Sequence, residues 1–349
     1  MDAFEVSEML HKLLPITAKR YKNLLAFGNE IMTLKDIETN KIIFQVDSHK
    51  ILVKMGDIFD FFFFSVDGTK LYLISTNAQV TIYDISNLND IKLNGQYIPD
   101  TTVGQTHNLH IFKKDYFIIA YSTGYNRNRR KGKVDYTIIV KIDNTGHVIE
   151  NLDFFSDINC DDYTDHYFYQ GLHYPSDRIY SLEYEPHLKI REIQLKSTKI
   201  FKSYILVRLR SISDYKYYAC DYYDKNYKKH LYKFYLIDLE NDCKELIYEY
   251  DYSKDIPSHY KKEPTIITSQ PRYVENDTVY ISLDFSSSEK EKEDHFDIKV
   301  IKINYIKKTS QIILDKSFDV PNYILKADKE YVLIQDVENY DVLAYKFNL

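Results

Sequence analysis

The 349-residue sequence contains no tryptophan and only nine glycines. Enzymes that bind dinucleotides or nucleoside triphosphates need glycine-rich loops, because a backbone without Cβ atoms can approach phosphate closely. No G-x-G-x-x-G or G-x-x-x-x-G-K-[ST] pattern occurs, and neither does the G-x-S-x-G or H-E-x-x-H pattern of common hydrolases. These absences argue against phosphate-loop enzymes and against two large classes of hydrolase.

Cysteines are also few: Cys160, Cys220 and Cys243, an odd number with no C-x-x-C spacing. This usage fits a reducing compartment better than a disulfide framework. The start, MDAFEVSEML, lacks a basic region followed by a long apolar one, so we expect no signal peptide. The longest apolar run, residues 58–66, is interrupted by Asp60 and is too short to span a bilayer. We therefore expect a soluble, cytoplasmic protein with no membrane partner.

Aromatic residues are abundant instead, with 34 tyrosines and 19 phenylalanines. Tyrosine and β-branched residues favour strands, because their side chains pack well on a half-buried sheet. The formal net charge of −6 creates no overall positive field, so nucleic acid is not expected as a partner. Composition thus favours an all-β protein.

A strand pattern repeats seven times along the chain. In the stretch Ser65–Ile85, SVDGTKLYLISTNAQVTIYDI, a tight turn precedes an apolar run and then an alternating run that ends in IYDI. Similar endings, LKDI, IYDI, IVKI, IREI, LIDL, VIKI and AYKF, start at residues 34, 82, 139, 190, 236, 300 and 344. The steps between them are roughly 45 to 65 residues, which is the period of a β-propeller blade with loop insertions.

Further strands flank each copy. The preceding strands are NLLAFGN, LYLISTN, YFIIAYST, RIYSLEYE, YKYYACDYY, TVYISLDF and EYVLIQD, each after a polar turn. The following strands, absent after the last copy, are KIIFQV, IKLNGQ, HVIENLDF, TKIFKSY, KELIYEY and SQIILDKSF. These units predict an all-β, seven-bladed β-propeller. Six or eight blades, a β-sandwich with insertions and a two-domain β protein are the alternatives.

The stretch Ser65–Ile85 resembles the S-x-D-G-x-x-L-Y-L…V-x-I-Y-D-I strands of WD40-like and lactonase-type propellers. The resemblance covers one blade well and the other blades only as a pattern, and no WD dipeptide is present. It implies a propeller fold and names no family within that fold.

The repeat is expected to form a single domain over residues 1–349. Since the seventh copy lacks a following strand, residues 1–19 are expected to pack on the last blade or to complete it. Apolar residues that alternate from Phe4 would suit a closing strand. The capping-box spacing of Asp2 and Glu5 favours a short N-terminal helix instead. Either arrangement would cover the open edge of the blade.

Long insertions are concentrated on one face of the predicted propeller. They follow second strands or lie between blades, whereas the turns after first and third strands are short. Binding residues concentrate in long loops on a rigid scaffold, and tyrosine and arginine dominate interface hot spots. The candidate partner-binding residues are Tyr125, Asn126, Arg127, Arg129, Arg130, Lys131, Tyr222, Tyr223 and Tyr227.

Histidines and acids beside two predicted inner strands form a weaker candidate site. The resemblance to lactonase-type propellers implies that such residues can hold a divalent metal at the mouth of an axial channel. The candidate ligands are His107, His110, Asp165, His166 and His173. The acidic loop around Asp161 lacks the calcium-loop pattern. Neither a cofactor nor a small-molecule ligand is expected from these patterns.

The sequence therefore favours a non-catalytic propeller that binds a protein partner through its long-loop face. An intracellular inhibitor or immunity-type protein that blocks a toxin is one form of this function. The alternative is a metal-dependent hydrolase or lactonase with its site at the channel mouth.

Overall fold

In the computed structural model, strands make up nearly all of the regular structure. The structure describes residues 17–54, 56–100, 103–123, 137–154, 167–169, 179–193, 206–213, 215–223, 230–258, 265–287, 296–318, 322–336 and 341–347. Within these ranges the helical segments are a single α-helical turn, α2 (Ser48–Ile51), and a single 3-10 turn, η3 (Ser253–Asp255). The chain divides between Gln194 and Leu195 into two compact units, which we call the N-terminal and C-terminal units.

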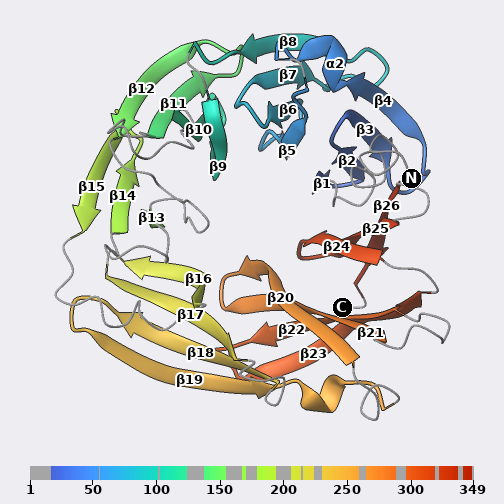
Figure 1. The fold of residues 1–349 in the computed structure, drawn as a ribbon, viewed down its shortest axis with the longest axis vertical. Coiled ribbons are helices and arrows are strands. Elements are labelled where there is room, and N and C mark those ends of the chain that lie inside the picture. Colours follow the sequence, from blue (N-terminus) through green and yellow to red (C-terminus); the bar gives the residue numbers. More distant parts are fainter. Residues whose placement is uncertain are drawn as a thin grey trace, which may run out of the picture. The chain divides into compact units, whose positions relative to one another are not determined.

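The N-terminal unit contains sheets one to four, each an antiparallel sheet whose strands are neighbours in chain order (Figure 1). Sheet one has β1 (Thr17–Tyr21), β2 (Leu24–Gly28), β3 (Ile31–Asp36) and β4 (Ile42–Asp47), and sheet two has β5 (Phe59–Phe64), β6 (Lys70–Ser75), β7 (Val80–Asp84) and β8 (Lys92–Tyr97). Sheet three has β9 (Val103–Phe112), β10 (Tyr116–Thr123), β11 (Thr137–Asp143) and β12 (Val148–Phe154), and sheet four has β13 (Tyr167–Tyr169), β14 (Ile179–Glu183) and β15 (Lys189–Ile193).

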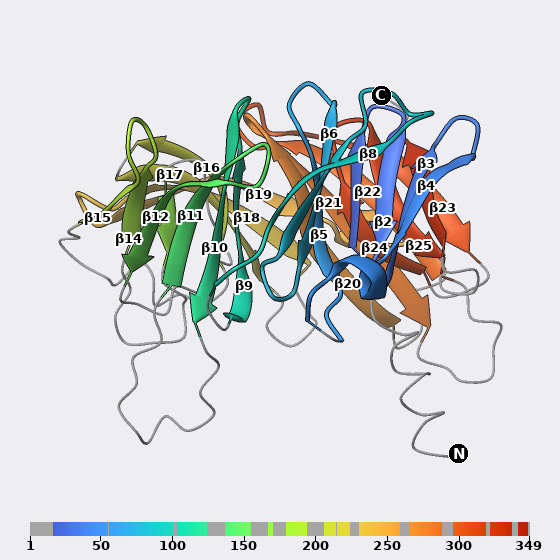
Figure 2. The ribbon, with the colours of Figure 1, turned by 90° about the horizontal axis from the view of Figure 1, so that it is seen from above.

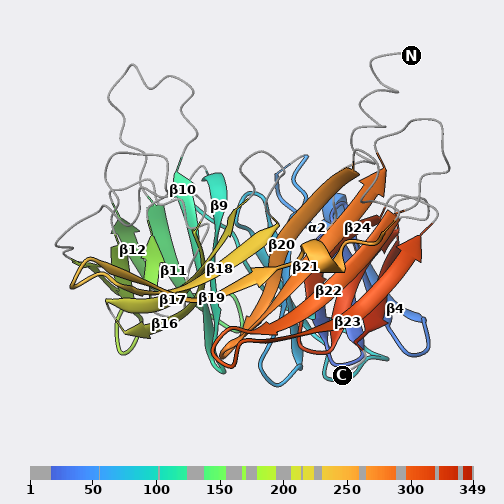
Figure 3. The ribbon, with the colours of Figure 1, turned by 90° about the horizontal axis from the view of Figure 1, so that it is seen from below.

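The C-terminal unit repeats the same arrangement in sheets five to seven. Sheet five has β16 (Leu206–Ser213), β17 (Lys216–Tyr223), β18 (Leu231–Asp238) and β19 (Cys243–Asp251). Sheet six has β20 (Thr265–Glu275), β21 (Thr278–Ser287), β22 (Phe296–Asn304) and β23 (Thr309–Phe318), which lie side by side in Figure 3. Sheet seven has β24 (Asn322–Ala327), β25 (Tyr331–Asp336) and β26 (Asp341–Lys346).

Consecutive sheets within a unit bury their faces against each other. In β6, Leu71 and Leu73 belong to the hydrophobic cluster shared with sheet one, whereas Tyr72 and Ile74 belong to the cluster shared with sheet three. Successive side chains of a strand point to opposite faces, so a strand between two such clusters needs apolar residues at every position. This explains why the second and third strands read as short continuous apolar runs.

A backbone hydrogen bond recurs at one end of five sheets. The amide that follows the third strand donates to the carbonyl of the residue just before the second strand. The donor–acceptor pairs are Ile37–Asn23, Ile85–Thr69, Leu239–Tyr215, Tyr305–Asp277 and Phe347–Glu330, with N···O distances of 2.8, 2.8, 2.6, 3.2 and 2.8 Å. The bond ties two turns of each sheet together and identifies β3, β7, β18, β22 and β26 as equivalent strands.

The predicted fold class is confirmed. Within the described residues the chain forms successive small antiparallel sheets whose strands are neighbours in chain order, which is the architecture of a β-propeller. The number of blades in a closed ring and the single domain over residues 1–349 stay predictions. Of the segment 1–19, the last three residues begin β1 and pair with β2, whereas residues 1–16, with the helix or closing strand predicted there, lie outside the described residues.

Sheet four differs from its prediction by one strand. The turn after β14 contacts the preceding sheet, because the Leu188 amide donates to Glu150 of β12. The turn after β11, a third strand, makes the equivalent contact with its preceding sheet, where Asn94 of β8 donates to the carbonyl of Asn144. Figure 1 also shows β15 on the outer edge of the N-terminal unit, running in the same sense as β4, β8 and β12. RIYSLEYE and IREI are therefore the third and fourth strands, not the second and third. Neighbouring strands of similar length carry the same alternation, so periodicity alone does not distinguish them.

Candidate functional site

The sheets have two different ends, set by their up-and-down topology. We call the short-turn end the one that holds the turns after first and third strands, and the long-connection end the one that holds the turns after second strands and the links between sheets. Figure 2 shows α2, in the link between sheets one and two, at the opposite end of sheet one from the β3–β4 turn.

Turns at the short-turn end satisfy their own polar groups. The carboxylate of Asp84 accepts hydrogen bonds from the amide and hydroxyl of Ser86, and that of Asp36 accepts the equivalent pair from Thr39. Asp67 accepts from the hydroxyls of Ser65 and Thr69 and from the Thr69 amide, and these bonds lower the pKa of Asp67 to about 2. Such turns present carboxylates that are already used, so they offer a partner few unsatisfied groups.

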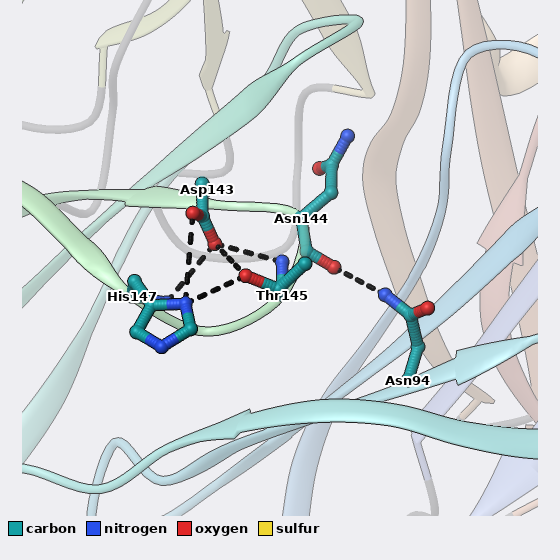
Figure 4. A network of polar contacts seen from close by, with 5 residues as sticks. All are labelled: Asn94, Asp143, Asn144, Thr145 and His147. Atoms are coloured by element: carbon teal, nitrogen blue, oxygen red, sulfur yellow. Dashed lines mark hydrogen bonds and ion pairs between the residues drawn. The ribbon is translucent and has the colours of Figure 1, made fainter.

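The β11–β12 turn joins sheet three to sheet two (Figure 4). Asp143 Oδ1 accepts from the amides of Thr145 and His147 and from the Thr145 hydroxyl, at 2.8, 3.0 and 2.7 Å. Oγ1 of Thr145 also lies 2.7 Å from Nδ1 of His147, and since the hydroxyl proton is directed at Asp143, Nδ1 is the donor in the tautomer that fits both contacts. In a nucleophilic triad the imidazole takes the hydroxyl proton, whereas here the hydroxyl gives its proton to the carboxylate. The cluster therefore shapes a turn and does not activate a nucleophile.

Asn144, in the same turn, makes three contacts. Its Oδ1 accepts from the hydroxyl of Tyr72 at 2.8 Å, its Nδ2 donates to the carbonyl of Lys114 at 2.8 Å, and its own carbonyl accepts from Asn94 Nδ2 at 2.6 Å. Tyr72 is almost fully buried, and burial raises the pKa of its hydroxyl. Asn144 is thus a structural link between two sheets.

We expect Asn144→Ala to lower the free energy of unfolding by roughly 1 to 3 kcal/mol, because it leaves the buried Tyr72 hydroxyl without an acceptor. Asn87→Ala is the control, since Asn87 caps an exposed turn within a single sheet. The two variants would be compared by urea denaturation at equal protein concentration. Equal stability of both variants would contradict the assigned role of Asn144.

At the long-connection end, the described residues of the link 48–58, which are 48–54 and 56–58, are bound to sheet two. The Val53 amide donates to Oε1 of Gln79 at 2.9 Å, and Nε2 of the same glutamine donates to the Ile51 carbonyl at 3.0 Å. The Thr76 amide donates to the Ile58 carbonyl at 3.0 Å. The Gln79 side chain is only 3% exposed, so its two hydrogen bonds are held inside the protein. The backbone around Ile51 and Val53 therefore has a defined conformation.

This fixed link, which we call the 48–58 platform, presents apolar and cationic side chains to solvent. Val53 is 70% exposed although its amide is held by the buried glutamine. Lys50 and Lys54 are exposed beside it, and the Lys54 ammonium bonds the neutral Asn77. An exposed aliphatic side chain on a rigid backbone loses little entropy when a partner covers it. The platform is thus the best-defined candidate surface at this end.

Two acids lie at the end of the platform and just after it, Asp57 and Asp60. Asp57 is 2% exposed, and its Oδ1 accepts from the Ile58 amide at 3.1 Å and from the Thr76 hydroxyl. Burial and then the charge of Asp57 raise the pKa of Asp60, which lies at an irregularity of β5. In the part of the chain that the structure describes, no group of three histidine, cysteine or acidic side chains is placed to hold a metal ion. We therefore assign no metal centre.

Of the candidate metal ligands, His107 and His110 lie on β9 where its pairing with β10 is irregular. The His110 ring is 5% exposed, and its centroid lies 4.5 Å from the Phe61 ring and 4.9 Å from the Phe63 ring. This position is a packed aromatic one. Asp165, His166 and His173 lie outside the described residues. The described structure therefore brings no predicted ligand set together.

Of the candidate partner-binding residues, Tyr222 and Tyr223 are the last two residues of β17, where they pair with Tyr232 and Leu231 of β18. They therefore stand at the long-connection end of sheet five, as predicted from the strand pattern. The other seven candidates, Tyr125, Asn126, Arg127, Arg129, Arg130, Lys131 and Tyr227, lie outside the described residues. Sequence reasoning did not single out Val53 or Gln79; the only signal for the first was the apolar run Ile51–Val53 within a long insertion.

No protein-family model and no curated protein sequence matches this chain. Solved structures similar to it include the β-propeller domain of Cps50 (Swd1) from Myceliophteria thermophila, at 10% identity over 95% of both chains with a TM-score of 0.46. The C-terminal WD40 domain of Sif2 is 9% identical over 94% of this chain and 91% of that chain, with a TM-score of 0.43. The WD40 domain of SCAP from fission yeast is 10% identical over 96% and 90%, with a TM-score of 0.41.

The chain has a β-propeller fold. At these identities the similar structures assign the propeller neither a partner nor an activity. Among the described residues, no helix of the propeller is long and apolar enough to cross a bilayer. Cys220 is a buried free thiol and Cys243 an exposed one.

Proposed function

We propose that this propeller is a non-catalytic interaction protein that binds a protein partner through its long-connection end. The difference between the two ends carries the proposal. Turns at the short-turn end use their carboxylates internally, whereas the 48–58 platform holds two exposed lysines beside Val53 on a backbone fixed by Gln79. An exposed valine, Val66, is present at the short-turn end as well, so the valine by itself does not distinguish the two ends. The loops of the long-connection end are the long ones in the sequence, and a rigid scaffold with long loops at one end suits partner recognition.

The proposal includes a location and one possible class of partner. We propose a reducing, cytoplasmic location, which the free thiols of Cys220 and Cys243 support. We also propose, as one form of the function, an inhibitor or immunity-type protein that blocks a toxin. Neither membrane nor nucleic acid is part of the proposal. A gel-shift series at increasing salt would test the latter, because binding to phosphates weakens steeply as salt rises.

We expect loop variants to lose partner binding without losing the fold. One variant reverses the charge of Arg127, Arg129 and Arg130, and another truncates Tyr222, Tyr223 and Tyr227 to alanine. Each buried aromatic anchor should cost roughly 1 to 3 kcal/mol of binding, and the arginines should mainly slow association. Proteins captured by the tagged wild-type chain would be identified by mass spectrometry, purified and measured by interferometry against each variant.

The matched control reverses three cations at the short-turn end: Lys41, Lys307 and Lys329, all exposed. It changes net charge by the same amount as the arginine variant. Asn144, which lies at the same end, is not a suitable control because it links two sheets. Binding that survives the loop changes but fails with the lysine changes would place the partner at the wrong end for this proposal.

A further inference from the structure

The fourth strand of every four-stranded sheet in the described structure contains a β-bulge. On each of these strands two residues oppose a single residue of the third strand, so the register shifts by one. The extra residues are Ile43 of β4, Asn94 of β8, Ile149 of β12, Ile247 of β19 and Ile313 of β23. A regular antiparallel pair needs no such residue, so five occurrences require a common cause.

The residue before each bulge is an exposed aliphatic one. Ile42, Leu93, Val148, Leu246 and Ile312 are 54, 56, 51, 47 and 40% exposed. Burying these side chains would be favourable, so burial does not explain where the bulges occur. The sequence around each bulge reads II, LN, VI, LI and II, rich in β-branched residues that favour a regular strand. The irregularity is therefore not a product of poor strand propensity.

Turn geometry does not fix the bulges either. In each of these sheets, one residue of the third strand pairs with the residue before the bulge. In the N-terminal unit this third-strand residue is the last but one of its strand: Lys35, Tyr83 and Ile142. In the C-terminal unit it lies three residues before the end, at Tyr235 and Ile301. The bulge is present in both units although its distance from the turn differs by two residues.

What these five strands share is their position at an edge of a sheet. The first strands β5, β9, β16, β20 and β24, at the other edge, also have bulges, whereas the pairs of second with third strands are regular. The outer side of an edge strand has unpaired N–H and C=O groups, and next to exposed aliphatic side chains it is a template for another strand. A bulge breaks the even spacing of those groups and twists the edge, so that a straight strand cannot pair along it. We propose that the five bulges keep the outer edges of these sheets from pairing with a second copy of this chain.

The remaining described fourth strand is consistent with this proposal. β15 pairs regularly with β14 and has no bulge. Three of its residues, Lys189, Arg191 and Glu192, are exposed and charged, and charged side chains are the other common protection of a strand edge. None of its large aliphatic residues with a described side chain is exposed, since Ile190 is half-buried. Charge alone is not specific to this edge, since the bulged β19 also has exposed acids at Glu245, Glu249 and Asp251; what β15 lacks is an exposed aliphatic side chain among those described.

Deletion of Ile149 tests the proposal. This residue is 53% exposed, and its removal lets Val148 and Glu150 become consecutive partners of Ile142 and Lys141 in a regular ladder. We expect the variant to self-associate with a dissociation constant at least about tenfold below that of the wild-type chain. Light scattering over a concentration series measures the association, and hydrogen exchange should show added protection of β12 amides in the associated form.

Two companion variants separate edge pairing from other causes. The protein with Ile149 deleted and Val148→Ser should still self-associate, because main-chain groups make the pairing. Loss of self-association in this double variant would show that the apolar side chain alone was responsible, and it would overturn the proposal. Unchanged association of the single deletion would overturn it as well. If that deletion unfolds the protein, deletion of Ile247 in sheet five decides in its place. Unfolding by both deletions would show that the bulges serve folding and not edge protection.

Discussion

Gly95→Ala is expected to lower the free energy of unfolding by roughly 2 to 4 kcal/mol. A Cβ atom at this position of β8 would lie 1.9 Å from the carbonyl oxygen of Thr145 in the β11–β12 turn. Both groups belong to the backbone, so relief requires sheets two and three to move apart or the turn to deform. The hydrogen bond between Asn94 and Asn144 lies beside this contact and would be stretched by the same movement.

Two other glycines separate steric overlap from backbone strain. Gly146 has φ +94°, and a Cβ there would lie 2.3 Å from the Gln96 carbonyl oxygen, so Gly146→Ala should suffer both effects. Gly56 has φ +78° with open space around it, so Gly56→Ala should cost only the strain of a left-handed residue, about 1 to 2 kcal/mol. Denaturant titrations should rank Gly146→Ala as the least stable of the three. A Gly95→Ala protein as stable as wild type would show that the two sheets do not approach this closely.

Arg272→Met is expected to cost roughly 3 kcal/mol, because it leaves a largely buried carboxylate without its cation. Arg272 occupies an irregularity of β20, from which Nη2 lies 3.5 Å from Asp284 Oδ2 and Nε donates to the Ser282 hydroxyl at 2.8 Å. The two side chains are 15% and 29% exposed, and the partial exposure of the carboxylate places the cost at the low end of the usual range. Arg272→Met with Asp284→Leu is the control, since replacing both partners removes the unpaired charge.

The pH dependence gives this variant a signature of its own. Burial, partly offset by Arg272, raises the pKa of Asp284 to about 6 from 3.8. The folded state therefore binds this proton more tightly than the unfolded state, and the contribution of the group to stability falls as pH rises from 3.8 to 6. Without the guanidinium the pKa rises further, so the loss in Arg272→Met should be larger at pH 7.5 than at pH 5. A loss that is independent of pH would contradict the assigned pairing.

The repeat was predictable because its signals are local. Asp84 at the end of a third strand and the apolar Ile85 after it mark a capped turn followed by a buried residue, and Asp36 and Asp238 repeat the arrangement. Besides IREI, which lies on a fourth strand, two copies were displaced along the third strand. The residues equivalent to Asp84 are Asp143 and Asn304, so the aligned segments IVKI and VIKI end one residue too early to contain them. Alternation has a period of two, and a pattern shifted by two residues satisfies it equally well.

The candidate site was less predictable than the fold. A sequence shows that the link between β4 and β5 is long, but not that Gln79 fastens it through two hydrogen bonds. Similarly, His110 was a plausible metal ligand because histidine binds metals and β9 is an inner strand. Its ring instead packs between Phe61 and Phe63, since the irregular pairing of β9 decides which way each side chain faces. Contacts between residues far apart in sequence decide both cases.

In five sheets the bond from the amide after the third strand limits where residues can be inserted. In sheet two it holds Ile85 against the carbonyl of Thr69, and in sheet five it holds Leu239 against that of Tyr215. The donor lies in the turn after the third strand, and the acceptor lies in the turn before the second strand. Residues inserted into one of these turns would move the amide and the carbonyl apart and break the bond between the two turns of the sheet. Foreign peptides, reporter tags or new chain termini are therefore better accommodated at the opposite end, in the links whose lengths already differ from sheet to sheet. The protein would then serve as a display scaffold in which the short-turn end is kept unchanged and the links at the long-connection end are varied.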